Sequence, residues 1–177
     1  LSKIDLAVYY AVFQVCFGLS AFGSILDLTW SPHVFRIMAK GGKIPSQLFK
    51  SIILLSVVTL LCSVAYFFLM PFFQWILLPK NYFLEWELYI WFILGLFCKI
   101  LYSIINPFLI ALNKNSYFIY ITLISAIISV SLNLYLIKYG LVYAAIVFFI
   151  SWVIQLSLLI ISVSYANKNI SILQSSY

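Results

Sequence analysis

The chain has 177 residues, of which 66% are hydrophobic and 8% are charged, and its formal net charge is +6. A soluble domain of this length has too small an interior to bury so much apolar surface, so the composition excludes a soluble globular protein and indicates a membrane protein. The basic residues are scattered among apolar runs and do not form a basic patch with regularly interleaved aromatic residues, so the sequence predicts no nucleic-acid partner.

Five apolar segments are long enough to cross a hydrocarbon layer of about 30 Å, which takes about 20 helical residues. Each segment is expected to be a helix, because a lone strand would leave its backbone groups without hydrogen bonds in lipid. The predicted fold class is therefore an all-α membrane protein. It consists of a single transmembrane domain with spans near residues 6–30, 48–70, 88–112, 116–137 and 141–164.

Three prolines mark expected irregularities in these spans. The first helix is expected to end at Pro32, which places His33 at the membrane interface. Pro71 is expected to stop the second helix and to leave a short apolar segment lying at the interface. Pro107 lies inside the third span, where it removes a backbone donor, so a kink is expected beside Asn106.

The charges of the connecting segments predict an orientation. If the first loop is cytoplasmic, six basic residues lie inside, namely Arg36, Lys40, Lys43, Lys50, Lys114 and Lys168, and three lie outside, namely Lys3, Lys80 and Lys138. Since basic residues are retained in the cytoplasm, the first residue is expected outside and the C-terminus inside. An external start without a signal peptide indicates that the chain is the later part of a longer protein.

The few polar side chains in each span recur at helical spacing, so each span has one more polar face. Small and hydroxylated residues also let membrane helices pack closely and bond to their own carbonyls, which is the preferred explanation for the second span. The five stripes, in chain order, are Ser20, Gly23, Ser24 and Asp27; Ser56, Thr59 and Ser63; Gly95, Lys99, Ser103 and Asn106; Thr122, Ser125, Ser129 and Asn133; and Ala144, Ser151, Gln155 and Ser162.

Lys99 and Asp27 are the ionisable members of these stripes. Lys99 lies roughly 18 to 20 Å from either end of its span, and a charge at that depth costs about 2.5 to 3.5 kcal/mol. It is either paired with a carboxylate or a carbonyl for structural reasons or exposed to a functional cavity. Asp27 either faces cytoplasmic water or pairs with Arg36, or it is a protonatable carboxylate that couples transport to an ion.

Residues typical of catalysis are scarce. Glu85 and Glu87 are the only close carboxylates, and their position at a helix start is explained by the helix dipole. The three cysteines have no metal-ligand spacing, and no phosphate loop or nucleophile motif occurs. We therefore expect no catalytic residues, no metal and no cofactor, and the chain is not expected to be an enzyme.

Several stretches together resemble the second half of bacterial polysaccharide flippases, the O-antigen transporter branch of the multidrug and oligosaccharidyl-lipid exporter superfamily. YYAVFQVCFGLSAFGSILDLTWSPHVFRIM resembles the eighth helix of that family, and LLPKNYFLEW resembles the outer turn before its tenth helix. The most recognisable stretch is NPFLIALNKNSYFIYITLISAIISVSLNLYLIKYGLVYAAIVFF, with a polar turn, a helix bearing Asn and a paired Ala. The resemblance extends over essentially the whole chain.

This resemblance implies five helices of the C-terminal bundle of a two-bundle, alternating-access transporter in the bacterial inner membrane. The implied activity is movement of undecaprenyl-diphosphate-linked O-antigen or capsule units to the outer leaflet. Implied partners are this lipid-linked oligosaccharide, membrane lipids, the absent N-terminal half and the polysaccharide polymerase machinery. Lys99 is then the candidate anion-binding residue, with Asn106, Asn133 and Gln155 lining the cavity and Asp27 as the ion-coupling candidate.

Two other functions remain open. One is a drug or cation exporter of the same superfamily, which the sequence barely distinguishes from a flippase. The other is a membrane-embedded enzyme of polysaccharide synthesis. The short outer loops disfavour that enzyme, because a polymerase or ligase of this pathway needs a large external loop with basic residues.

Overall fold

The structure, a computed structural model, describes residues 3–39, 44–77 and 86–175. It contains five long helices, and the described part of the chain has no strand. The helices are α1 (Lys3–Met38), α2 (Ser46–Leu77), α3 (Trp86–Ala111), α4 (Asn115–Leu136) and α5 (Leu141–Ser175), with a short 3-10 helix, η1 (Ile137–Tyr139), between the last two. All five are long and apolar enough to cross a membrane, so the predicted fold class is confirmed.

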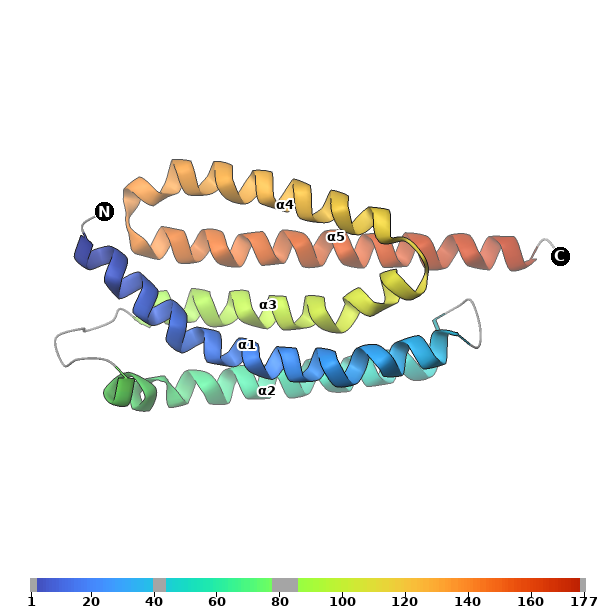
Figure 1. Cartoon of the computed structure of the whole chain (residues 1–177), viewed down its shortest axis with the longest axis horizontal. Coiled ribbons are helices and arrows are strands. Elements are labelled where there is room, and N and C mark those ends of the chain that lie inside the picture. The colour runs from blue at the N-terminus through green and yellow to red at the C-terminus, as the bar shows by residue number, and fades with distance from the viewer. Residues whose placement is uncertain (1–2, 40–43, 78–85, 176–177) are drawn as a thin grey trace.

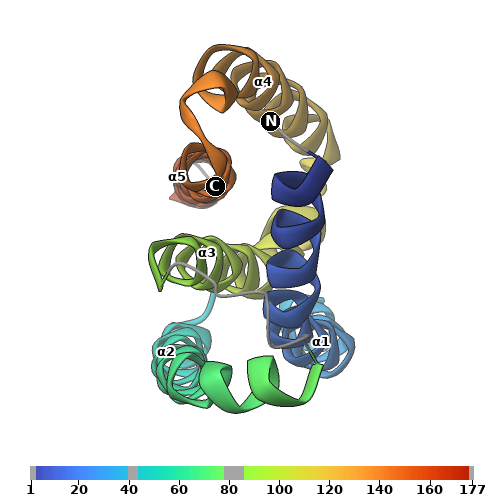
Figure 2. The same ribbon diagram turned by 90° about the vertical axis from the view of Figure 1, so that its left-hand side faces the viewer.

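Successive helices run in opposite directions, and the two termini lie at opposite ends of the bundle (Figure 1). The central element is α3, which packs against α1, α2 and α5, while α4 packs mainly against α5 (Figure 2). Half of the most apolar stretch of α3 is buried, compared with 11% for α2 and for α4. The two outer helices therefore present most of their apolar side chains to the surroundings, as expected in lipid.

Two of the proline predictions were wrong. α1 continues through Pro32 to Met38, so His33 lies inside a helix, with its ring 5.6 Å from that of Trp30. α2 continues through Pro71 to Leu77, and Figure 2 shows its last turns pointing sideways from the main helix axis. A proline removes only one backbone hydrogen bond, and a long apolar helix tolerates this loss where neighbouring groups compensate.

The third proline behaves as the sequence predicts. Pro107 lies inside α3, and the helix changes direction towards its C-terminal end (Figure 1). The indole Nε1 of Trp30 donates a hydrogen bond of 2.8 Å to the main-chain oxygen of Ile104, one turn before Pro107. This bond attaches α1 to α3 at the point where the proline interrupts the helical hydrogen bonding.

Helix α5 is longer than predicted, because it runs to Ser175 rather than to residue 164. The prediction counted only the apolar stretch, whereas residues 165–175 include no Gly or Pro that would end the helix. The side-chain oxygen Oδ1 of Asn167 accepts a hydrogen bond of 3.3 Å from the backbone N–H of Ile44. Ile44, just before α2, is thereby joined to α5.

The polar stripe of α2 has a structural role. The hydroxyls of Ser56, Thr59 and Ser63 each donate a 2.8 Å hydrogen bond to the main-chain oxygen four residues earlier. The interpretation of this stripe as self-bonded hydroxyls is confirmed. The three cysteines are free thiols, and Cys16 and Cys98 are buried.

Candidate functional site

The described helices form two polar hollows; Trp152 lines one of them and lies near Lys99, which lines the other. The first, which we call the charged hollow, lies between α1 and α3 and has a volume of about 250 Å³. It is lined by Ser20, Gly23, Ser24, Asp27, Leu28, Lys99, Ile100 and Ser103. The structure therefore places the polar stripe of the first span opposite that of the third.

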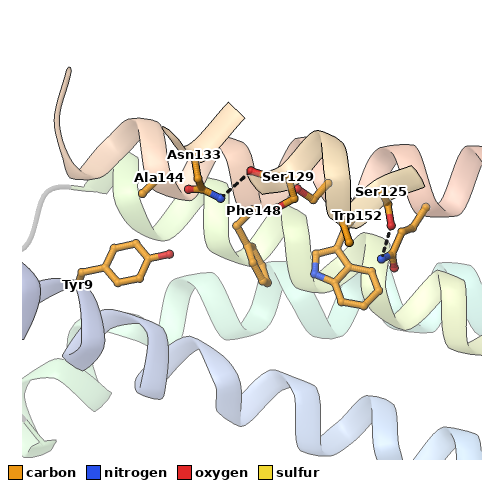
Figure 3. Close-up of a pocket in the computed structure, with 10 residues that line it drawn as sticks. Tyr9, Ser125, Ser129, Asn133, Ala144, Phe148 and Trp152 are labelled. Carbon is orange, nitrogen blue, oxygen red and sulfur yellow. Dashed lines mark hydrogen bonds between the residues drawn. The ribbon is translucent and has the colours of Figure 1, made fainter. Parts of the chain in front are cut away.

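The second hollow, which we call the amide pocket, lies between α4 and α5 and has a volume of about 270 Å³ (Figure 3). It is lined by Tyr9, Ser125, Ala126, Ser129, Asn133, Ala144, Phe148, Ser151, Trp152 and Gln155. The stripes of the fourth and fifth spans thus also face each other. Of the candidate residues, Lys99 and Asp27 lie in the charged hollow, and Asn133 and Gln155 in the amide pocket.

The ammonium group of Lys99 is held by uncharged partners. Its Nζ donates a 2.7 Å hydrogen bond to Oγ of Ser20 on α1. It also lies 4.8 Å from the ring centre of Phe17 and 5.9 Å from that of Trp152, where the negative face of each ring attracts the cation. Among the described side chains, Lys99 has no ion pair. An ammonium group has three donors, so two are left for a ligand in the hollow.

Close contact between α1 and α3 shapes the charged hollow. Gly23 faces Ile100 so closely that a β-carbon at position 23 would lie 2.8 Å from Cγ1 of Ile100. Ser20 is only 5% exposed, and Ser24 donates a 3.2 Å hydrogen bond to the main-chain oxygen of Ser20. The hydroxyl that orients Lys99 is therefore fixed within a packed interface between the two helices.

Asp27 lies at the other end of the charged hollow. It is seven residues beyond Ser20 on α1, which corresponds to about 10 Å along the helix. The carboxylate is exposed and accepts a 2.7 Å hydrogen bond from Oγ of Ser31. Within the described part of the chain it pairs with neither Arg36 nor Lys99, so the suggested pairing with Arg36 is wrong.

The amide pocket is lined by neutral polar groups and aromatic rings. Nε2 of Gln155 donates a 2.8 Å hydrogen bond to Oγ of Ser125, and Nδ2 of Asn133 donates one of 3.0 Å to the main-chain oxygen of Ser129 (Figure 3). These bonds use the amide nitrogens, and no described group donates to either amide oxygen. The pocket therefore offers two amide acceptors at fixed positions.

The two hollows occupy different depths of the bundle. The amide pocket extends from the middle of α4 and α5 towards the end that carries η1, where Asn133 and Ala144 lie. The charged hollow extends from Lys99, in the middle of α3, towards the opposite end, where Asp27 lies. Trp152 lines the amide pocket, and its ring centre lies 5.9 Å from Nζ of Lys99, which lines the charged hollow.

Asn106 lines neither of these hollows. It is half-buried beside Pro107, and its Oδ1 is a buried acceptor with no hydrogen-bond donor among the described residues. The structure therefore does not bring Asn106 together with the other three cavity candidates. It does place Ser103, its neighbour in the same stripe, in the charged hollow.

Sequence reasoning missed four aromatic residues of the two hollows, because it considered only polar side chains. These residues are Tyr9, Phe17, Phe148 and Trp152. Trp152 could have been found, because it lies three residues before Gln155 and therefore on the same helical face. Phe17 carries the same signal, because it lies three residues before Ser20. Tyr9 carries none, since it reaches the amide pocket from α1 whereas the other lining residues belong to α4 and α5.

Part of the sequence-based interpretation lies outside the described residues. The outer turn of LLPKNYFLEW falls mostly within residues 78–85, and nothing is described there. Glu87 lies in the first turn of α3, consistent with a carboxylate favoured by the helix dipole.

Comparisons with protein-family models, with curated protein sequences and with solved structures found no match to this chain. The functional argument therefore depends on the two hollows and on the motifs in the sequence.

Proposed function

We propose that this chain is part of a flippase that moves a diphosphate-linked oligosaccharide lipid, of the undecaprenyl-diphosphate type, across the bacterial inner membrane. The observation that carries the proposal is the unpaired ammonium group of Lys99 in the central helix α3, facing the charged hollow. The resemblance to the second half of polysaccharide flippases supports the same function.

The chemistry of the charged hollow suits an anionic lipid headgroup. A diphosphate is costly to move through hydrocarbon, and a cation in the wall of the path lowers that cost. Lys99 is held by a hydroxyl and two aromatic rings, which orient the ammonium without neutralising it. Its charge is therefore free to attract phosphate oxygens, with Ser103 as a hydroxyl donor in the same hollow.

The orientation follows from the basic residues. Arg36, Lys50, Lys114 and Lys168 all lie at the end of the bundle that carries the C-terminus. By the positive-inside rule we assign this end to the cytoplasm and the N-terminus to the outside. The charged hollow then faces the cytoplasmic half of the membrane, where the lipid-linked substrate enters, and Asp27 lies nearest that entrance.

A complete carrier of this kind alternates access between two bundles. We propose that this chain supplies most of one bundle, that an N-terminal half supplies the other, and that the polymerase machinery receives the product. A drug exporter fits less well, because most drugs of that class are cationic and Lys99 would repel them. An enzyme also fits less well, since Asp27 has no second carboxylate beside it among the described residues that line the charged hollow.

The test uses the complete protein in cells whose surface polysaccharide depends on it. Lys99→Ala is expected to abolish surface polysaccharide while the protein still inserts, and Lys99→Arg is expected to retain part of it, because the charge is kept. Lys138→Ala is the matched control, since Lys138 lies at the other end of the bundle over the rings of Tyr135 and Tyr139. Normal polysaccharide in the Lys99→Ala cells would remove Lys99 from the mechanism.

A further inference from the structure

We infer that the amide pocket is a binding site for one uncharged sugar ring, separate from the anion site at Lys99. The inference builds on the proposed function, because it assigns the sugar and the diphosphate of one substrate to two different hollows. The ten residues that line the pocket carry no charge, and their polar groups are amides and hydroxyls.

The hydrogen-bonding groups match those of a sugar. Each sugar hydroxyl both donates and accepts, and the open oxygens of Gln155 and Asn133 are acceptors for two such donors. The hydroxyls of Tyr9 and Ser129 line the same pocket and form no hydrogen bond with any described residue. The pocket therefore presents donors and acceptors together, as a ring bearing several hydroxyls requires.

The aromatic residues supply the apolar part of such a site. Trp152 and Phe148 extend from α5, and Tyr9 reaches the pocket from α1 (Figure 3). A pyranose ring has an apolar face of C–H groups, which packs favourably on an aromatic ring. Phe148 is itself fixed by contacts with Phe13 and Phe92, at centroid distances of 6.0 and 5.4 Å, so this surface is rigid.

Charge and position separate this pocket from the anion site. An ionised sugar would lose its water in the amide pocket without gaining a charged partner, so a neutral ring is favoured. Trp152 lines the pocket and also lies 5.9 Å from the ammonium of Lys99. A ring on one side of Trp152 is therefore next to a phosphate held on the other side.

The experiment measures binding of two kinds of probe to the purified complete protein in lipid nanodiscs. The sugar probes are the methyl glycosides of glucose, galactose and N-acetylglucosamine, with methyl glucuronide as the charged comparison, followed by saturation-transfer NMR. The anion probe is inorganic pyrophosphate. At least one neutral glycoside is expected to bind, and methyl glucuronide is expected to bind about tenfold more weakly.

Two variants separate the hollows. Gln155→Leu is expected to weaken glycoside binding about tenfold, which corresponds to the loss of a hydrogen bond, and to leave pyrophosphate binding intact. Lys99→Ala is expected to weaken pyrophosphate binding and to leave glycoside binding intact. Retained pyrophosphate binding also shows that Gln155→Leu folds. Ser157→Ala, on the exposed face of α5, is the matched control and is expected to change neither glycoside binding nor pyrophosphate binding.

Each outcome has a distinct meaning. If no glycoside binds while pyrophosphate does, the sugar site is refuted and the flippase proposal stands. If glycosides bind Gln155→Leu as tightly as wild type, the site lies elsewhere. Equal affinity for methyl glucuronide overturns the preference for an uncharged ring. The flippase proposal is tested by the polysaccharide assay of Lys99→Ala and by pyrophosphate binding, and the sugar site by glycoside binding, so the two failures are distinguishable.

Discussion

Replacement of Gly95 by alanine tests whether α3 and α5 are held together by a close helix contact. A β-carbon at position 95 would lie 2.6 Å from two ring carbons of Phe148 and 3.3 Å from the main-chain Cα of Phe149. The ring cannot move aside easily, because Phe13, Phe92 and Trp152 surround it. We therefore expect Gly95→Ala to destabilise the bundle.

The size of the effect follows from two opposing terms. Overpacking a well-packed interior costs about 1 to 3 kcal/mol, whereas alanine gains about 0.5 to 1 kcal/mol over glycine inside a helix. From the middle of each range, the net loss is about 1 kcal/mol, which for a chain of this length lowers the apparent Tm by about 2 to 4 °C. The assay is thermal unfolding of the purified complete protein in detergent, followed by circular dichroism.

A double-mutant cycle isolates the contact itself. In a Phe148→Ala background the ring is absent, so Gly95→Ala is expected to be neutral or slightly stabilising, apart from the close main chain of Phe149. The sign of the Gly95→Ala effect therefore changes with the residue at position 148. If Gly95→Ala lowers the Tm equally in both backgrounds, the ring contact does not limit the approach of the helices.

Two further predictions concern α1. Trp30→Phe removes the hydrogen bond to the main-chain oxygen of Ile104, so we expect a loss of about 0.5 to 1.5 kcal/mol in the free energy of unfolding. The indole of Trp91 packs without such a hydrogen bond, so Trp91→Phe should lower the free energy of unfolding less. An equal loss in the two variants would show that the bond from Trp30 to Ile104 contributes nothing. Asp27→Asn is expected to abolish the dependence of transport on a proton gradient, whereas Glu87→Gln should preserve it. Unchanged dependence in Asp27→Asn would exclude Asp27 from coupling.

Helical periodicity predicted a more polar side for each span, and most members of the first, third, fourth and fifth stripes line one of the two hollows. It did not predict which helices are neighbours. The hydrogen bond from Lys99 to Ser20 joins residues 79 positions apart, and Gln155 meets Ser125 across 30 positions. Such contacts depend on how five similar apolar helices pack. The sequence does not predict this packing, because the lipid-facing and core-facing surfaces of the helices have almost the same composition.

The errors at Pro32 and Pro71 have a common physical cause. The expectation that proline ends a helix is strongest in water, where unpaired backbone groups are readily solvated and the chain can leave the helix cheaply. In a long apolar segment the alternative is to expose several backbone groups to hydrocarbon, which costs more than one missing hydrogen bond. Both helices therefore continue, and only the direction of α2 changes beyond Pro71.

The environment of Lys99 bears on the two explanations that the sequence left open. A lysine kept for structure needs a carboxylate or a carbonyl to offset the cost of its burial, and the described residues provide neither. Its partners are a serine hydroxyl and the faces of Phe17 and Trp152, which stabilise a cation without cancelling its charge. Glutamine could bond to Ser20 at a lower desolvation cost, so hydrogen bonding alone does not explain the ammonium. A charge that is held but not neutralised is explained by a negatively charged ligand, or by a carboxylate from an N-terminal half, and pyrophosphate binding to the complete protein separates the two.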